Sequence, residues 1–100
     1  MSEMRKYRKV TVEVTAEDIT SGIQCSRQNC PVARALNRAC PPPSGTRWAV
    51  GLPDLYLEAG NAKTRIGILP PVASDFVLRF DEEGEVDPIA FTVLLPENLL

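Results

Sequence analysis

The sequence predicts an α+β domain: a mostly antiparallel sheet of about five strands with two main helices. Val10, Val12 and Val14 alternate with polar residues, which is the two-residue period of a half-buried strand. Between Pro31 and Ala39, apolar residues recur every three or four positions, as on one face of a helix. Proline and glycine separate these segments from short runs of strand-forming residues.

A length of 100 residues indicates one domain, 1–100, of which residues 1–6 are expected to be flexible. The expected order is β-α-α-β-β-β-α-β, over residues 7–14, 16–21, 31–39, 46–50, 54–59, 63–69, 71–83 and 89–95. Thr15 and Asp18 form a capping-box variant at the start of the first helix. Pro31 suits the first turn of the second helix and makes Cys30 its N-cap.

The second half of the chain is predicted to contain a strand meander, a helix and a final strand. Gly60 opens a two-residue hairpin turn, and Ile66 and Ile68 share one face of the following strand. Both faces of the final strand are largely apolar, which suits a central strand or an interface. We therefore expect a homodimer through this strand or the neighbouring helix.

Charge is distributed in zones along a chain whose net charge is −2. Residues 27–65 hold six basic residues against two acidic ones, and residues 75–97 hold seven acidic residues against Arg79. Arginine suits bidentate recognition of phosphate or carboxylate. Six cations over this length do not form a nucleic-acid stripe, and the acidic end would repel a polyanion. A small anion or an acidic partner is thus expected rather than a nucleic-acid polymer, with a solvated mixed-charge face as the alternative.

Several function classes are excluded by composition. The absence of histidine removes the commonest general base and metal ligand, so we expect no enzyme activity. Cys25, Cys30 and Cys40 do not match a zinc pattern, so neither metal nor cofactor is expected. An odd number of cysteines without a secretion signal favours free thiols and the cytoplasm. No apolar run is long enough to cross a membrane, so no membrane partner is expected.

Two segments are candidate ligand sites. In the first, the helix that starts at Pro31, shortly after Arg27, could bind an anion at its N-terminus and would favour the Cys30 thiolate. Alternatively, the polar residues before Pro31 only cap this helix. In the second, Arg47 and Trp48 lie on a strand next to those of Tyr56 and Arg65, so the aromatic rings could stack on a ligand ring while the arginines bind a phosphate. Alternatively, Trp48 packs in the core with Arg47 outward. The full predicted ligand-binding set is Arg27, Arg34, Arg38, Arg47, Trp48, Tyr56 and Arg65.

Several short motifs resemble a pattern in short hypothetical proteins of phage genomes, from about residue 10 to residue 95. The motifs are Asp18-Ile19-x-x-Gly22, Cys30-Pro31-Val32-Ala33-x-Ala35-Leu36, Phe76-Val77-x-x-Phe80-Asp81, Gly84-Glu85-Val86-x-Pro88 and Phe91. The resemblance implies a phage-encoded protein that acts in the bacterial cytoplasm by binding a host protein or by sequestering a nucleotide signal of antiviral defence. It supplies no site residues.

Two functions follow as hypotheses. In the first, the protein sequesters an anionic nucleotide-like signal as an anti-defence protein. In the second, it inhibits a host protein by masking it, with the acidic segment 81–87 as the contact surface. Arginines gathered with an aromatic ring in a concave site would favour the first, and dispersed arginines with a flat acidic face would favour the second. Replacing Arg34 and Arg38 by alanine is expected to abolish ligand binding without unfolding, because both lie on the polar side of their helix.

Overall fold

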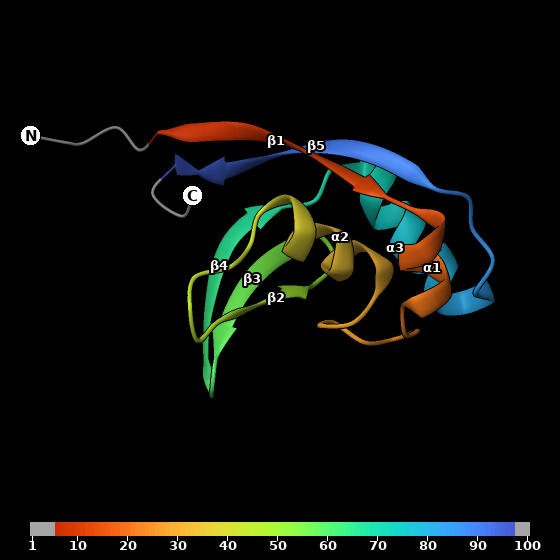
Figure 1. Cartoon of the computed structure of the whole chain (residues 1–100), viewed down its shortest axis with the longest axis horizontal. Helices are drawn as coiled ribbons and strands as arrows, with labels where there is room; N and C mark the ends of the chain where they lie inside the picture. Colours follow the sequence, from red (N-terminus) through yellow and green to blue (C-terminus); the bar gives the residue numbers. More distant parts are fainter. Residues whose placement is uncertain (1–5, 98–100) are drawn as a thin grey trace, which may run out of the picture.

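The computed structural model describes residues 6–97, in which five strands and three helices follow the predicted order (Figure 1). The elements are β1 (Tyr7–Val14), α1 (Ala16–Ser21), α2 (Pro31–Ala39), β2 (Arg47–Val50), β3 (Asp54–Ala59), β4 (Ala62–Ile68), α3 (Pro71–Glu83) and β5 (Ile89–Pro96). The segment predicted to be flexible, 1–6, lies outside the described residues except for Lys6. The carbonyl of Lys6 accepts a hydrogen bond from the Glu97 amide at 2.9 Å.

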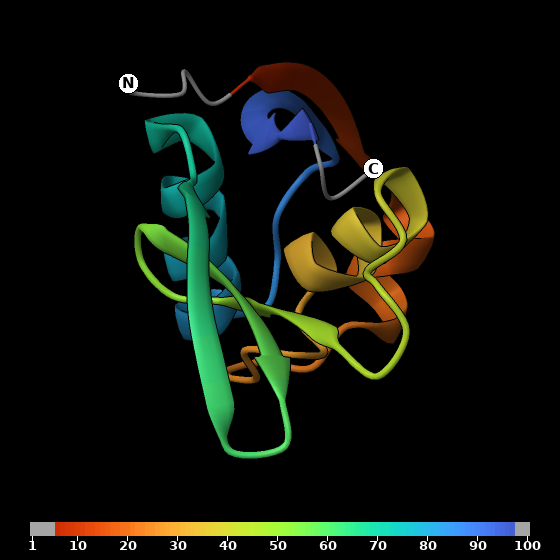
Figure 2. The same cartoon turned by 90° about the vertical axis from the view of Figure 1, so that its left-hand side faces the viewer.

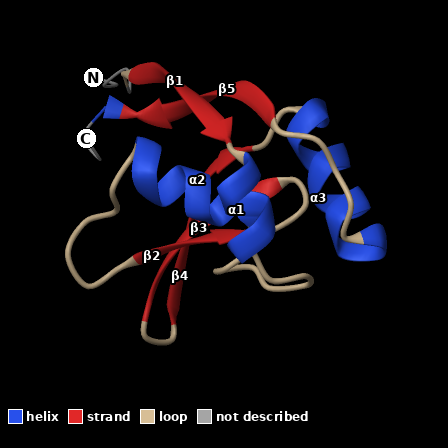
Figure 3. Ribbon diagram, turned by 45° about the vertical axis from the view of Figure 1, so that its right-hand side comes forward, coloured by secondary structure: helices blue, strands red, loops and turns tan. Residues whose placement is uncertain are grey.

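The α+β class and the antiparallel pairing are confirmed, but the strands form two sheets instead of one. β1 and β5 pair as a two-stranded ribbon, and β2, β3 and β4 form a three-stranded sheet in that order. Helix α2 contacts both β1 and β2, so it lies between the ribbon and the sheet (Figure 3). α2 and α3 flank opposite sides of the core beneath the ribbon (Figure 2). The core is therefore enclosed by two sheets and two helices.

β5 pairs with β1 alone, so it is not the central strand of a sheet that its apolar faces suggested, although its other side faces β4. Phe91, Val93 and Leu95 are buried, whereas the alternate residues Ala90, Thr92 and Leu94 are exposed. Of these three exposed residues only Leu94 is large and apolar, so the second face is less apolar than the sequence suggested.

The local signals at the ends of elements are confirmed. Thr15 and Asp18 form the complete capping box, and the Cys30 side chain caps α2. Gly84 ends α3 with φ of +78°, in the left-handed region that favours glycine. Gly60, with φ of +60°, opens the two-residue turn between β3 and β4.

The prediction that Ile66 and Ile68 share a face is wrong because β4 contains a bulge. Leu55 pairs with Gly67 and Tyr56 pairs with Arg65, which leaves Ile66 as an extra residue. An extra residue reverses the alternation of faces along a strand. Ile66 consequently packs against the core while Ile68 is 52% exposed.

Within the described residues, no helix is both long and apolar enough to span a membrane.

Candidate functional site

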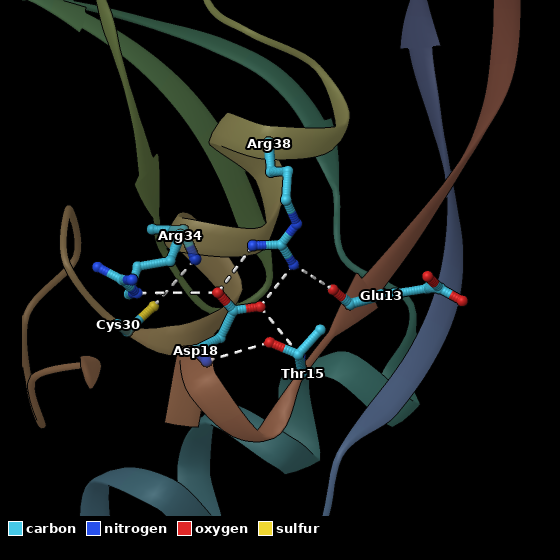
Figure 4. Close-up of polar contacts among 7 residues, drawn as sticks. Glu13, Thr15, Asp18, Cys30, Arg34 and Arg38 are labelled. Carbon is cyan, nitrogen blue, oxygen red and sulfur yellow. Dashed lines mark hydrogen bonds and ion pairs between the residues drawn. The ribbon is translucent and has the colours of Figure 1, made fainter. Parts of the chain in front are cut away.

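Four of the five predicted arginines pair with acidic side chains of the protein itself, and the most buried of these acids is Asp18. Asp18 is the third residue of α1, and only 1% of it is exposed. Arg38 of α2 donates two hydrogen bonds to its carboxylate, from Nη1 to Oδ1 at 2.9 Å and from Nη2 to Oδ2 at 2.7 Å (Figure 4). The Thr15 amide donates to Oδ2 at 2.9 Å, and Nε of Arg34 lies 3.8 Å from Oδ1.

This arrangement keeps Asp18 charged and joins three elements. The hydrogen bond from Arg38 lowers the pKa of Asp18 despite the opposing effect of burial, and it raises the pKa of Arg38. Arg38 Nη2 also donates to the Glu13 carbonyl at 2.8 Å, so one guanidinium ties α2 to both α1 and β1. Arg38 is therefore a structural residue, and the double variant Arg34→Ala, Arg38→Ala, expected from the sequence to lose ligand binding without unfolding, would leave the buried Asp18 carboxylate without its hydrogen-bonded cation.

Four other predicted site residues lie around the three-stranded sheet. Arg27 donates to Glu58 at 2.7 Å, and Arg47 donates at 2.9 Å to Gln28, which itself donates to Glu58. Arg65 donates to an Asp54 carboxylate oxygen at 2.9 Å. Tyr56 donates to the other Asp54 oxygen at 3.3 Å, and the Lys63 ammonium lies 4.6 Å from the centre of its ring.

Trp48, the seventh residue of the set, is fully buried, and its indole N–H donates to the Cys40 carbonyl at 2.8 Å. The core interpretation of Trp48 is therefore confirmed, and the ring has no exposed face for stacking. Arg47 is exposed, as that interpretation requires. The predicted set is thus divided among Asp18, Glu58, Asp54 and the core.

The start of α2 acts as a capped helix end. The Cys30 sulfur accepts a hydrogen bond from the Ala33 amide at 3.5 Å. Burial raises the pKa of the Cys30 thiol, so the expectation that its thiolate is favoured is wrong. Arg27 points to Glu58 and does not complete an anion site at the helix end. The capping interpretation accounts for this segment.

Carboxylates that form no salt bridge within the described residues lie beside α3. Two adjoining grooves, of about 680 and 330 Å³, lie between α3 and the segment that follows it, and Arg79, Val86 and Asp87 line both. We call the two together the acidic groove. Its other lining residues are Ile19, Val72, Asp75, Phe76, Glu83, Gly84, Glu85 and Ile89.

The acidic groove combines apolar surface with exposed carboxylates. Ile19, Val86 and Ile89 are half-buried and supply apolar wall. Residues 75–87 hold six acids against Arg79, a net charge of −5. Among the described residues, no salt bridge involves any of these acids, although the Asp81 carboxylate accepts a hydrogen bond from the Cys25 amide at 2.8 Å.

The acidic segment could be identified from the sequence, but the groove could not. The signal was present in Val86, an apolar residue set between Glu85 and Asp87. A residue of this kind in an acidic turn indicates that the segment packs against something, here beside α3. In the part of the chain that the structure describes, the acidic segment included, no group of three cysteine, aspartate or glutamate side chains could hold a metal ion.

Comparison of the chain with protein families, curated proteins and solved structures finds no match. The fold and the grooves are therefore the basis for assigning a function.

Proposed function

We propose that this protein is a non-enzymatic interaction module that binds a basic segment of a partner protein in the acidic groove. The observation that carries the proposal is the contrast between the two kinds of charge. The arginines of the predicted ligand set bind internal acids or polar groups, whereas the carboxylates beside α3 line a groove and form no salt bridge within residues 6–97.

The chemistry of the groove fits lysine and arginine side chains. Their hydrocarbon stems can pack on apolar surface while the charged ends remain near carboxylates. Val86 and Ile89 supply such apolar surface, and Glu83, Glu85 and Asp87 supply the carboxylates. A surface of one charge sign also accelerates the encounter with a partner of the opposite sign. A basic segment with interspersed apolar residues is the expected ligand.

A nucleotide phosphate has less to bind on this protein. To bind Arg38, a phosphate would have to displace a bidentate carboxylate that also caps α1. The masking hypothesis therefore has the stronger support. The resemblance to short phage-encoded proteins supplies the setting that we propose, in which the partner is a bacterial host protein with a basic surface.

The test is binding of a fluorescent peptide that alternates lysine and leucine, compared with its glutamate counterpart. The double variant Glu83→Lys, Glu85→Lys should weaken binding of the basic peptide by about tenfold or more, because attraction becomes repulsion. Glu97→Lys is the control for a charge reversal outside the groove, because Glu97 follows the far end of β5 from it. Affinity capture from a bacterial lysate with the wild type and the double variant then identifies host proteins that need the groove.

The proposal fails if the double variant binds the basic peptide as well as the Glu97→Lys control does. A thermal shift produced by cyclic nucleotides or ADP-ribose derivatives, but not by basic peptides, would favour the sequestration hypothesis instead.

A further inference from the structure

One edge of β1 pairs with β5, and within residues 6–97 no strand pairs with its other edge. Lys6 and Glu97 share a backbone hydrogen bond, so this pair is of the hydrogen-bonded kind. In an antiparallel ladder the two kinds of pair alternate. The register then places Tyr7, Lys9, Thr11 and Glu13 in non-hydrogen-bonded pairs, with their N–H and C=O groups directed away from β5. Pro96, which has no N–H, pairs with Tyr7 and fits this assignment.

Within the described residues, these outward groups find a hydrogen-bond partner at one end of β1. The Glu13 carbonyl accepts a hydrogen bond from Arg38. Among the described residues, no hydrogen bond engages the outward N–H and C=O groups of Tyr7, Lys9 or Thr11.

The edges of the other outer strands are covered at least in part. The Val50 amide of β2 donates to the Arg27 carbonyl at 2.9 Å, so a loop occupies the β2 edge. β5 faces β4, where a Cβ atom on Gly67 would lie 3.2 Å from the Leu94 carbonyl oxygen. An uncovered strand edge is a template for pairing with another chain.

A groove follows the β1 edge, with α2 as its opposite wall. Two openings of about 290 and 580 Å³ share the lining residues Thr11 and Ala39. The other lining residues are Arg8, Lys9, Val10, Glu13, Ala35, Arg38, Cys40 and Pro41. No lining residue belongs also to the acidic groove. The two surfaces can therefore be tested separately.

We propose that an extended acidic segment of a partner protein adds to the β1 edge as a strand in this groove. Backbone hydrogen bonds to Lys9 and Thr11 would supply the pairing, as in other cases of recognition by strand addition. Arg8 and Lys9 line the larger opening, and Arg38 is already bound to Asp18. The unpaired charge at the N-terminal end of β1, where the strand edge is free, is therefore positive, and this favours carboxylates in the added strand.

A second copy of this chain fits the edge less well than a single peptide strand does. Antiparallel self-pairing centred on Lys9 would place two lysines directly opposite each other, which destabilises a strand pair. Centring on Val10 or Thr11 would bring the Glu13 backbone into the pairing, where Arg38 occupies its carbonyl, and centring on Arg8 would place two arginines opposite each other. The α2 wall also limits the space beside β1.

The test uses a fluorescein-labelled heptapeptide that alternates glutamate and valine, with its lysine–valine counterpart as the control. Hydrogen exchange should show protection of the Lys9 and Thr11 amides by the acidic peptide. Lys9→Glu should weaken binding by about fivefold at low salt. Lys63→Glu, an equal charge change on the three-stranded sheet, should leave it unchanged.

Thr11→Pro removes an outward N–H without removing a bond of the β1–β5 ladder. It should weaken binding about fivefold or more, whereas Thr11→Val, which retains the N–H, should not. The Lys9→Glu result and the protection pattern do not depend on whether the proline variant folds.

Three results would overturn the proposal. The first is no binding of the acidic peptide at millimolar concentration. The second is binding that protects amides other than those of the β1 edge or that survives Lys9→Glu. The third is a doubled mass by light scattering with the edge amides protected before any peptide is added, which would assign the edge to self-association. None of these depends on the basic peptides used for the acidic groove.

Discussion

Replacing Asp18 with asparagine tests the energetic role of the most buried ion pair. The substitution preserves shape but removes the charge that Arg38 binds through two hydrogen bonds. Oδ2 of Asp18 also accepts from the Thr15 amide. Asparagine has one oxygen and one NH₂ group, so whichever way it turns, the NH₂ donor faces an N–H of the guanidinium, and in one orientation it also faces the Thr15 amide.

The expected loss of stability is about 2–3 kcal/mol. A hydrogen bond to a charged group contributes about 1.5–3 kcal/mol, and the lower value applies because the Arg38 side chain is 52% exposed. The buried donor left without an acceptor adds about 1 kcal/mol. For a domain of this size the change corresponds to a fall in Tm of roughly 10–20 °C.

Urea unfolding followed by Trp48 fluorescence measures the effect, since this single tryptophan is fully buried in the folded state. Asp54→Asn is the matched control, because its partner Arg65 is 55% exposed and the pair should contribute less than about 1 kcal/mol. If Asp18→Asn lowers the free energy of unfolding no more than Asp54→Asn does, the structural role given to this pair is wrong.

Three further predictions follow from the same structure. Because the pKa of Asp18 is lowered in the folded state, its contribution to stability is complete above the ordinary carboxyl pKa and is lost as pH falls below about 4. Unfolding curves of the wild type and Asp18→Asn should therefore converge in acid. Gly22→Ala should lower the free energy of unfolding by about 1–3 kcal/mol, since its Cβ would lie 2.7 Å from a ring carbon of Pro31. Gly45→Ala is the control: it has open space around it and should lower the same free energy by about 1 kcal/mol or less. Thermal unfolding measures both. Thiol labelling with a coloured reagent should modify Cys25 quickly in the folded protein and the two buried cysteines only after unfolding, because burial also raises their pKa.

The elements of the fold were predictable because their signals are local. The capping box at Thr15, the Cys30-Pro31 start of α2 and the Gly84 end of α3 depend on neighbouring residues only. The division into two sheets depends on which strands meet, and residues 7–14 pair with residues 89–96 across nearly the whole chain. The bulge at Ile66 likewise depends on the register with β3. Long-range strand pairing and register of this kind are difficult to predict from a single sequence.

The site was predicted less well, for a reason that concerns pairing of charge. Counting arginines measures the charge that is present, but function needs charge that remains available after folding. Arg38 binds a carboxylate twenty positions away, and Arg27 binds one thirty-one positions away. No pattern of neighbouring residues in the sequence predicts these ion pairs. The acidic segment was identified because its carboxylates are close in sequence and remain without salt-bridge partners in the described structure.

The acidic groove and the groove along the β1 edge carry opposite charge, and the salt dependence of peptide binding distinguishes how each would bind its partner. Raising the salt concentration from 0.1 to 1 M shortens the Debye length from about 10 Å to about 3 Å, which screens exposed charges strongly. Binding of the basic peptide in the acidic groove rests mainly on such charges, so its affinity should fall steeply. Strand addition at β1 rests also on backbone hydrogen bonds at Lys9 and Thr11, which are short-range and insensitive to screening. The acidic peptide should therefore lose less affinity than the basic peptide over the same salt range. Equal losses for the two would mean that the β1 edge attracts the acidic peptide by charge alone, without forming a strand pair.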